Sequence, residues 1–507
     1  MAESVNHAPE TPEGDSLFPP DHPKAASLPE VWRIAWPLII SNCFWTLQIT
    51  IDRIMLSKIS PDAVSAVMMT AMIYYVPFIL LQMTASYVTT FVAQYGGAGR
   101  NNRVGPVMWQ AIYFSIGAGL LFLLVLPFTP SIIASLGHSP ELQAMERDYF
   151  SCLAWLSLPA LLLAAISGFF AGRGESQRVM QLNGIGFAVN AVLDYLLIFG
   201  KFGFPAMGVM GAGIATIAAS WIPAIIGLMW MLAPKFREIY ATTDTRFDPK
   251  LFRRLLRFGM PSGFQWMLDI TAFTVFMAII GWFGEIELAA SSIAFTINMT
   301  AFLPMMGVGQ AVAVMVGQRL GQDRPDLAER STLTSFKMAW GYMASIAILY
   351  ITVPSLFIML FESTENQEKF DQVAPLIRTL LIFIAIYSLF DSMGLIFSFA
   401  LRGAGDTRFV TLVSLVLSWP MMVVPTYYLA YQERWGLNWA WGFASLYIIT
   451  LALIFLFRFR TGRWKSMRVI EPIVADIEPE ASAPNAAIDA AVGAAVDAAA
   501  GATITTR

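Results

Sequence analysis

The stretch RIAWPLIISNCFWTLQITIDRIMLSK, residues 33–58, decides the fold. It is a largely apolar run, and at about 1.5 Å per residue an α-helix of this length crosses the roughly 30 Å of hydrocarbon in a bilayer. The run also holds Asp52. An ionisable residue inside a membrane span is costly and by default marks a functional site. Pro37, near the start of the run, is a candidate hinge, although prolines in such helices are more often fixed kinks.

The composition of the whole chain agrees with this first span. Of the 507 residues, 57% are hydrophobic and 13% are charged, whereas a soluble globular domain has about 25% charged residues. The sequence therefore predicts a polytopic membrane protein whose partner is the lipid bilayer and not nucleic acid. Two cysteines and three histidines are too few for a catalytic or metal-ligating group. We expect no cofactor and no metal beyond a monovalent cation.

Apolar runs long enough to span a membrane recur along the chain, and they predict an all-α fold with twelve transmembrane helices. The runs are 34–57, 63–94, 107–128, 150–171, 180–200, 210–233, 258–283, 288–318, 333–361, 375–401, 408–430 and 437–457. An even number of spans places both termini on one side. With that side in the cytoplasm, 25 of the 32 Lys and Arg residues lie in cytoplasmic segments and 7 in the opposite loops. The positive-inside rule therefore favours cytoplasmic termini, in an inner (plasma) membrane of bacterial type.

The two halves of the chain resemble each other at an offset of 224 positions. Arg33–Pro37 falls on Arg257–Pro261, and Gln94, Gly97 and Arg100 fall on Gln318, Gly321 and Arg324. Two parallel six-helix repeats predict two pseudo-symmetric lobes around a central cavity. The predicted organisation is a polar N-terminal tail (1–29), a first lobe (30–234), a cytoplasmic linker (235–257), a second lobe (258–460) and a C-terminal tail (461–507) that is basic and then Ala-rich and disordered.

Within the linker, Asp248-Pro249 is predicted to begin a short helix. Its membrane-facing side would carry Leu251, Phe252, Leu255 and Leu256.

Four carboxylates lie well inside predicted spans, and no Lys or Arg is predicted to lie as deep. They are Asp52, Asp194, Asp269 and Asp391. An interior with acids alone suits cations, whether protons, sodium ions or positively charged organic molecules. The alternative for any one acid is a packing role, in which it accepts hydrogen bonds from Ser, Thr or Tyr hydroxyls across helix contacts.

The predicted depth of each acid in the membrane indicates which of them lie near each other. The first and fifth spans run in the same direction, so Asp52 and Asp194 fall at similar depth in the outer half of the first lobe. Asn183, Asn190 and Asp194 are spaced i, i+7 and i+11, which places them on one helix face. We expect this face to meet Asp52 and a water-filled pocket. Two neighbouring carboxylates are not both ionised without a large cost, so the pair is expected to carry protons.

These residues resemble the multidrug and toxic compound extrusion (MATE) family over about residues 30–460. The resemblance is carried by Pro37 with Asp52 fifteen residues later, Asn190-x-x-x-Asp194, Asp269 shortly after Pro261, and Asp391 followed by the motif LRGAGDT at 401–407. A twin of that motif, GRGES, stands at 172–176. The resemblance implies a monomeric antiporter that exchanges H⁺ or Na⁺ for amphipathic, usually cationic, organic compounds by alternating access between its lobes.

The resemblance also implies roles for individual residues. In the NorM-like branch, acids of the first, seventh and tenth helices bind the coupling cation and the drug, and Asp52, Asp269 and Asp391 stand there. The pair Asn190 and Asp194 instead resembles the DinF-like branch, in which the first lobe takes up protons. The implied cation or proton site is Asp52, Asn190, Asp194, Asp269 and Asp391. The implied substrate cavity is Asn183, Gln265, Asp269 and Asp391. The coupling ion stays open.

Other readings of the sequence predict other functions. A flippase for lipid-linked oligosaccharides shares the fold superfamily, but its cavity usually carries basic residues. An intramembrane aspartyl protease would use the Gly-x-Gly-Asp pattern of residues 403–406, but Asp406 lies at a predicted helix end between Arg402 and Arg408. A non-transporting sensor would not need four buried acids. The sequence therefore favours a transporter that is not an enzyme.

Overall fold

The computed structural model describes residues 18–361 and 367–471, and within these ranges every regular element is helical. The helices of the first half are α1 (Leu28–Ser57), α2 (Pro61–Ser86), α3 (Val88–Gly97), α4 (Val104–Leu123), α5 (Thr129–Ala134), α6 (Pro140–Gly172), α7 (Ser176–Phe199) and α8 (Gly208–Met231). The linker carries α9 (Pro234–Tyr240). The helices of the second half are α10 (Pro249–Gly281), α11 (Glu285–Gly321), α12 (Pro325–Thr352), α13 (Pro354–Ile358), α14 (Gln367–Ala404), α15 (Thr407–Ser418) and α16 (Leu437–Arg460).

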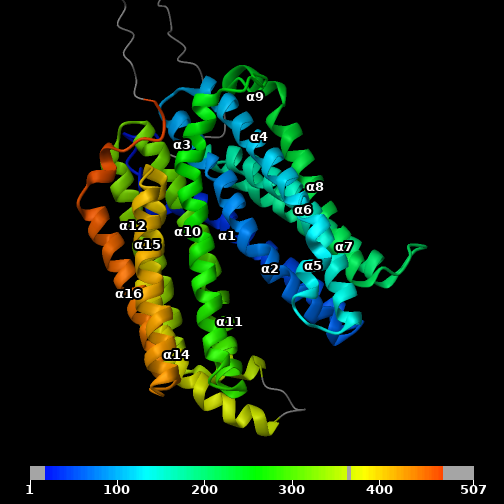
Figure 1. Ribbon diagram of the computed structural model, residues 1–507. Helices are drawn as coiled ribbons and strands as arrows, with labels where there is room; N and C mark the ends of the chain where they lie inside the picture. Colours follow the sequence, from blue (N-terminus) through cyan, green and yellow to red (C-terminus); the bar gives the residue numbers. More distant parts are fainter. Residues whose placement is uncertain (1–17, 362–366, 472–507) are drawn as a thin grey trace, which may run out of the picture. The chain divides into compact units, whose positions relative to one another are not determined.

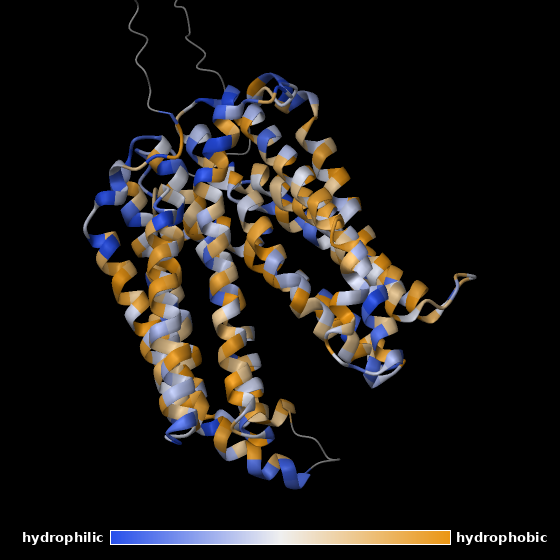
Figure 2. Cartoon of the chain, in the orientation of Figure 1, coloured by the Kyte–Doolittle hydropathy of each residue, from blue (hydrophilic) through white to orange (hydrophobic). Residues whose placement is uncertain are grey.

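The membrane spans agree with the predicted number, with one broken span. Among the described residues, eleven helical segments are long and apolar enough to cross a membrane, and a bent pair brings the total to twelve. In that pair α12 meets the segment Pro354–Phe361 at 92°, so the span predicted over 333–361 is sharply bent. Pro354 has no N–H to donate, and it disfavours helical geometry at the residue before it. Val353 accordingly has φ −134° and ψ 54°. Figure 2 shows hydrophobic residues along the middle of the helices and hydrophilic residues at their two ends.

The start of α10 was predicted, but its course was not. Asp248 caps the helix by accepting hydrogen bonds from the N–H groups of Lys250 and Leu251. The helix then continues for 33 residues through Pro261, so there is no separate short helix. Leu251 and Leu255 are buried in the protein and do not face the membrane as expected, because the packed face of α10 extends back past the proline.

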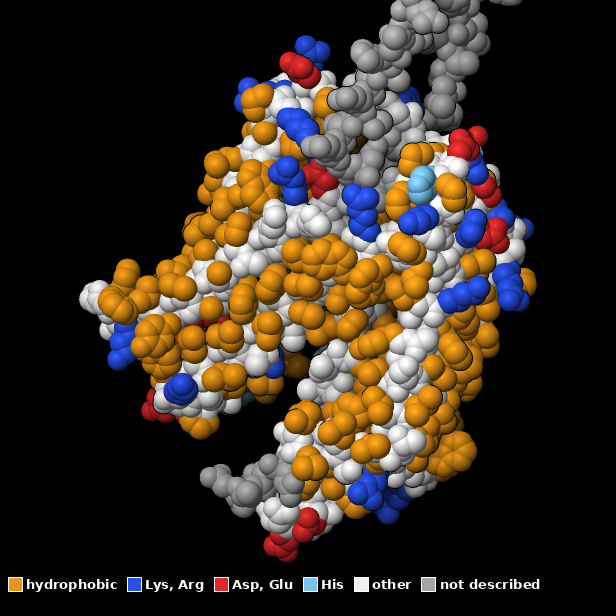
Figure 3. All heavy atoms as spheres, turned by 180° about the vertical axis from the view of Figure 1, so that it is seen from behind, with side chains coloured by type: hydrophobic (Ala, Val, Ile, Leu, Met, Phe, Trp, Pro, Cys, Tyr) orange, Lys and Arg blue, Asp and Glu red, His pale blue; other side chains and the backbone are white. Residues whose placement is uncertain are grey.

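Each half of the chain packs as its own group of helices. In the first, α7 and α6 pack on α8, α2 and α4 pack on α6, and α1 packs along α7. In the second, α14 contacts α11, α12 and α16, and α10 contacts α15. The groups meet where α10 packs on α2 and α11 packs on α1 and α3. Figure 1 shows them side by side near α3 and apart near α5 and α11, and Figure 3 shows a hollow between them at that second end.

Two glutamines at equivalent repeat positions join the lobes where they meet. Gln94 Nε2 donates to the carbonyl oxygen of Gly403 at 3.0 Å. Gln318 Nε2 donates to the carbonyl oxygen of Gly172 at 2.8 Å. Each glutamine therefore bonds to the backbone of the other lobe, in the loop motif that follows that lobe's fourth span. We call this set of contacts the closed end.

Two glycines, also at equivalent repeat positions, allow the lobes to approach at the closed end. A Cβ atom added at Gly97 would lie 2.1 Å from the carbonyl oxygen of Gln318, and one at Gly321 would lie 2.3 Å from that of Gln94. These obstacles are backbone atoms of the opposite lobe, which no rotamer change removes. The closed end is thus a contact between two backbones.

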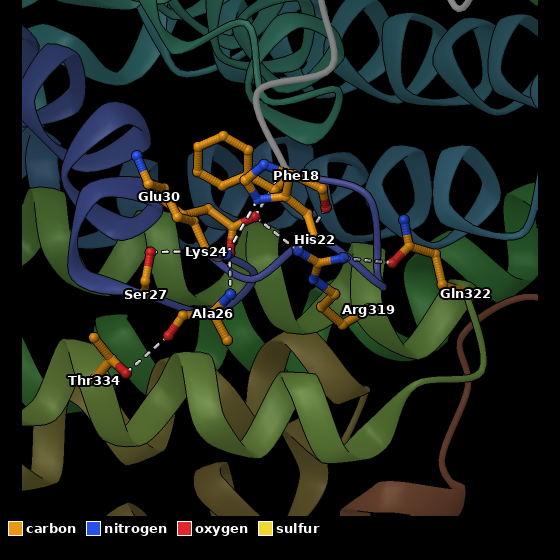
Figure 4. A network of polar contacts seen from close by, with 9 residues as sticks. All are labelled: Phe18, His22, Lys24, Ala26, Ser27, Glu30, Arg319, Gln322 and Thr334. Atoms are coloured by element: carbon orange, nitrogen blue, oxygen red, sulfur yellow. Dashed lines mark hydrogen bonds and ion pairs between the residues drawn. The ribbon is translucent and has the colours of Figure 1, made fainter.

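A buried ion pair next to the closed end also links the lobes (Figure 4). Arg319, near the end of α11, donates to Glu30 in the first turns of α1 at 2.7 Å, and both side chains are fully buried. Glu30 also accepts from the N–H groups of Phe18 at 2.7 Å and Ala26 at 2.6 Å.

The residues just before α1 are therefore packed. Thr334 Oγ1 donates to the carbonyl oxygen of Ala26 at 2.9 Å, and Ala25 and Ala26 are buried against Leu327. The part of the predicted N-terminal tail after residue 17 is bound to the second lobe, because Glu30 needs donors in this buried position. The remainder of that tail and the Ala-rich C-terminal tail lie outside the described residues.

Replacing Glu30 by Ala is expected to destabilise the protein strongly, because it leaves the buried guanidinium of Arg319 without its carboxylate. Losing one partner of a buried ion pair costs about 3–5 kcal/mol. Thermal unfolding in detergent micelles measures the effect. Asp326→Asn is the matched control, since its pair with Arg324 is exposed, and it should leave the midpoint almost unchanged. Equal midpoints for the two variants would contradict the role assigned to Glu30.

Candidate functional site

Two carboxylates of the first lobe face each other where α1 packs along α7. Asp52 comes from α1 and Asp194 from α7, and they are 8% and 0% exposed. The two side chains are close enough to form a hydrogen bond if one of them carries a proton. Ionised carboxylates only accept. Accordingly, Asp52 Oδ1 and both carboxylate oxygens of Asp194 have no donor among the described residues. This arrangement is chemically suited to hold a proton or a small cation.

Neutral polar side chains and one positively charged side chain surround the pair. Asn190, one turn before Asp194, is buried and donates to Thr216 Oγ1 at 3.4 Å. Its carbonyl oxygen has no donor in the described part of the chain. Tyr149 on α6 lies within electrostatic range of both acids, and Arg53 is within range of Asp52. The pair is therefore buried among helices, and the expected water-filled pocket stays a prediction.

Asn183 lies apart from these acids. Its Nδ2 donates to Ser41 Oγ of α1, two helical turns from Asn190. The polar face of α7 therefore does face α1, as predicted. No hydrogen bond that the structure describes joins Asn183 to Gln265, Asp269 or Asp391. The four-residue substrate cavity stays a prediction.

The second lobe brings its two acids together. Asp269 on α10 accepts from Gln265 Nε2 at 3.3 Å and from the Tyr447 hydroxyl at 3.5 Å. Asp391 on α14 is close enough for its charge to interact with that of Asp269. A cavity of about 110 Å³ opens beside Asp269, and its aromatic walls include Phe273, Phe276, Tyr387, Trp441 and Tyr447. A carboxylate among aromatic rings suits a cation, because ring faces attract positive charge.

Arg402 is a charged site residue that the sequence analysis missed, and Tyr447 is an uncharged one. The guanidinium of Arg402 is buried and donates to Gln265 Oε1 at 2.7 Å. It lies over the rings of Trp266 and Phe399, 5.3 and 5.2 Å from their centroids. The prediction of an interior without basic residues is therefore wrong for the second lobe. α14 continues to Ala404, and side chains of a helix lean toward its N-terminus, so Arg402 reaches back into the lobe. The sequence has no helix breaker before Gly403, and this could have indicated that the helix continues through Arg402.

The acids of the two loop motifs have structural partners. Glu175 binds Arg173 at 2.5 Å and Arg178 at 2.9 Å. Asp406 binds Arg458 of α16 at 2.7 Å. An aspartate held in this way is not one of two facing catalytic carboxylates, so the protease pattern at residues 403–406 is a structural loop.

Pro37 lies inside an uninterrupted α1 and is buried. The structure shows a single conformation of this helix. The candidate hinge at Pro37 stays a prediction.

Comparison with known proteins agrees with this architecture. The family model described as MatE matches residues 37–196 and 261–428, one segment in each lobe. The chain is 26% identical over 428 residues to the multidrug resistance protein NorM of Burkholderia vietnamiensis, covering 84% of this chain and 92% of that protein. It is 27% identical over 399 residues to the multidrug resistance protein MdtK of Edwardsiella ictaluri, covering 78% and 86%.

Solved structures share the fold. The chain superposes with a TM-score of 0.76 on the outward-facing conformation of a multidrug resistance MATE family transporter of the MOP superfamily. The two are 20% identical, and the match covers 86% of this chain and 96% of the other. A MATE protein in its bent conformation gives a TM-score of 0.77, with 20% identity and coverage of 86% and 95%.

Proposed function

The chain belongs to the MatE (MATE) family of membrane transporters, and from this premise we propose that it exports amphipathic organic cations in exchange for H⁺ or Na⁺. Membership of the family sets aside the enzyme reading, since its members move solutes and do not transform them. The names of the NorM and MdtK relatives support a multidrug substrate range. Because Arg402 is a buried basic residue, an interior without basic residues no longer argues against a lipid-linked oligosaccharide flippase. The names of the relatives are now the argument against that alternative.

The observation that carries the proposal is the buried pair of Asp52 and Asp194. Burying one charge without a partner is expensive, and burying two like charges side by side is more so. A site of this kind gains most when it takes up a proton or a cation. Its position within the first lobe, away from Asp269 and Asp391, leaves the second-lobe acids free to receive a substrate.

Alternating access supplies the rest of the mechanism. The lobes are joined at the closed end and separated by a hollow at the other (Figure 3), so this conformation receives ligands from one side. If the coupling ion and the drug lower each other's affinity, they must do so reciprocally. Ion binding from the open side then favours drug release, and reversal of the two ends reloads the protein. In a bacterial-type inner membrane with both termini cytoplasmic, the open side is the outside. The protein acts as a monomer, since each lobe supplies its own acids.

Flux measurements on purified protein in lipid vesicles test the proposal. Efflux of a cationic dye is expected to accelerate at least tenfold when an inward proton or sodium gradient is imposed, and to return to the leak rate when that gradient is collapsed. A neutral dye of similar size, and vesicles without protein, are the controls. Dye transport that ignores both gradients contradicts the coupling, and a neutral dye transported equally well contradicts the proposed preference for cations.

A further inference from the structure

Arg402 joins the acid site of the second lobe to the contact between the lobes through a chain of hydrogen bonds. Its guanidinium donates to Gln265, which in turn donates to Asp269. Its backbone carbonyl oxygen accepts a hydrogen bond from the hydroxyl of Tyr87, in the first lobe, at 2.8 Å. The next carbonyl along the chain, that of Gly403, accepts the bond from Gln94 at the closed end. One short segment of α14 therefore touches both the acid site of the second lobe and the other lobe.

The internal repeat shows that closure alone does not need an arginine here. Aligning Gly405-Asp406-Thr407 with Gly174-Glu175-Ser176 places Gly403 on Gly172 and Arg402 on Ala171. Gly172 accepts the equivalent cross-lobe bond from Gln318. The first lobe thus forms its half of the closed end with alanine at this position. The arginine is an addition of the second lobe.

We propose that Arg402 is a positioning residue that couples the occupancy of Asp269 to the closed end. This inference rests on the proposed function. When Asp269 is ionised and empty, its charge attracts the guanidinium and keeps residues 402 and 403 where Tyr87 and Gln94 reach their carbonyl oxygens. A cation or a proton on Asp269 cancels that attraction. Arg402 is then released, the two cross-lobe bonds weaken, and the closed end opens.

The other ionisable groups around the site are consistent with this role. Asp391 on α14 and Tyr447 on α16 are close enough to interact electrostatically with Asp269, and Tyr387 on α14 lines the same cavity as Asp269. Among the described groups on these elements, Arg402 is the cation that interacts with Asp269. Asp406 is nearby but is paired with Arg458. The position of the Arg402 guanidinium therefore depends mainly on its electrostatic attraction to Asp269.

Distance measurements between spin labels test the coupling without requiring transport. Labels at Asn102 and Arg330, which are exposed on the first and second lobes, report on the closed end after Cys43 and Cys152 are replaced by Ser and Ala. In the otherwise wild-type protein, adding Na⁺ or lowering the pH is expected to lengthen the distance. In Arg402→Gln the shift should fall at least tenfold, while binding of the cation tightens about tenfold, since a neighbouring positive charge is gone. Arg402→Lys should restore part of the shift.

Arg408→Gln is the matched control, because it removes an exposed arginine directly after the same motif, and it should respond like the wild type. If Arg402→Gln does not fold, Asp269→Asn decides the question: its closed end should be open without added cation and insensitive to it. A wild-type shift in Arg402→Gln or in Asp269→Asn, or no shift in the wild type, overturns the inference. Dye efflux by the same preparations reports on the proposed function separately, since efflux can persist when the coupling through Arg402 fails.

Discussion

Replacing Asp52 by Asn is expected to reduce cation-coupled efflux at least tenfold, with little loss of folded protein. The amide has the shape of the carboxyl group and carries two donors. It therefore donates to Asp194, which removes the repulsion in the pair and imitates the protonated state. The variant remains folded, but the site neither takes up nor releases a proton at residue 52. Efflux of a cationic dye, driven by a proton or sodium gradient in vesicles, measures the loss.

Two comparisons make this prediction specific. Asp62→Asn removes an exposed acid from the first turn of the next helix, α2, and should leave efflux unchanged. The double variant Asp52→Asn with Asp194→Asn should be about as impaired as the worse single variant, because residues that form one site are not additive. Efflux at the wild-type rate in Asp52→Asn, or losses that multiply in the double variant, would show that the two acids act separately.

Replacing Gly97 by Ala is expected to prevent the closed end from forming and to reduce efflux at least tenfold. The added Cβ would lie 2.1 Å from a backbone oxygen and 2.8 Å from the carbonyl carbon of Gln318. Protein interiors are close-packed, so a methyl group without space forces neighbouring elements apart. Here the neighbour is the other lobe, and separating the two also breaks the bonds of Gln94 and Gln318. Labels at Asn102 and Arg330 should report a longer distance than in the wild type, even without added cation.

Gly96→Ala is an unusually close control for this variant. Gly96 is the preceding residue of α3, and an added Cβ there has no neighbour within 4 Å. Alanine in a helix is more stable than glycine by about 0.5–1 kcal/mol, so this variant should fold at least as well as the wild type and transport normally. If Gly97→Ala transports as well as Gly96→Ala, the close approach of the two backbones is not required for the transport cycle.

Local chemistry made much of the fold predictable. The length and hydropathy of each run indicate a membrane helix, because the bilayer interior provides no partners for backbone polar groups. Prolines and capping residues mark several boundaries, as Asp248 does for α10. The repeat was visible because equivalent contacts in the two lobes need the same residue types. Glutamine therefore stands at both 94 and 318, and glycine at both 97 and 321. The break at Val353 was missed, since apolar composition continues past it although the helix does not.

The candidate site was predictable only in part. Asp52 and Asp194 were paired correctly because two helices running in the same direction place residues of equal depth near each other. Arg402 was missed because its position in the sequence, next to a glycine-rich loop, says little about where a long side chain ends. The helix face that carries Asn183 was predicted to point toward α1, and its bond to Ser41 agrees, but its place in a substrate cavity stays a prediction.

The sequence by itself determined the class of protein, the number of spans, the internal repeat and the four acids inside the spans. These follow from the transfer of single residues between water and hydrocarbon, which depends on each residue and its near neighbours along the chain. Only the tertiary structure decided that Arg402 is linked to Asp269 through Gln265, and that Gly97 and Gly321 allow the lobes to meet at the closed end. Such pairings depend on the rotation and register of packed helices, which are set by contacts among residues hundreds of positions apart.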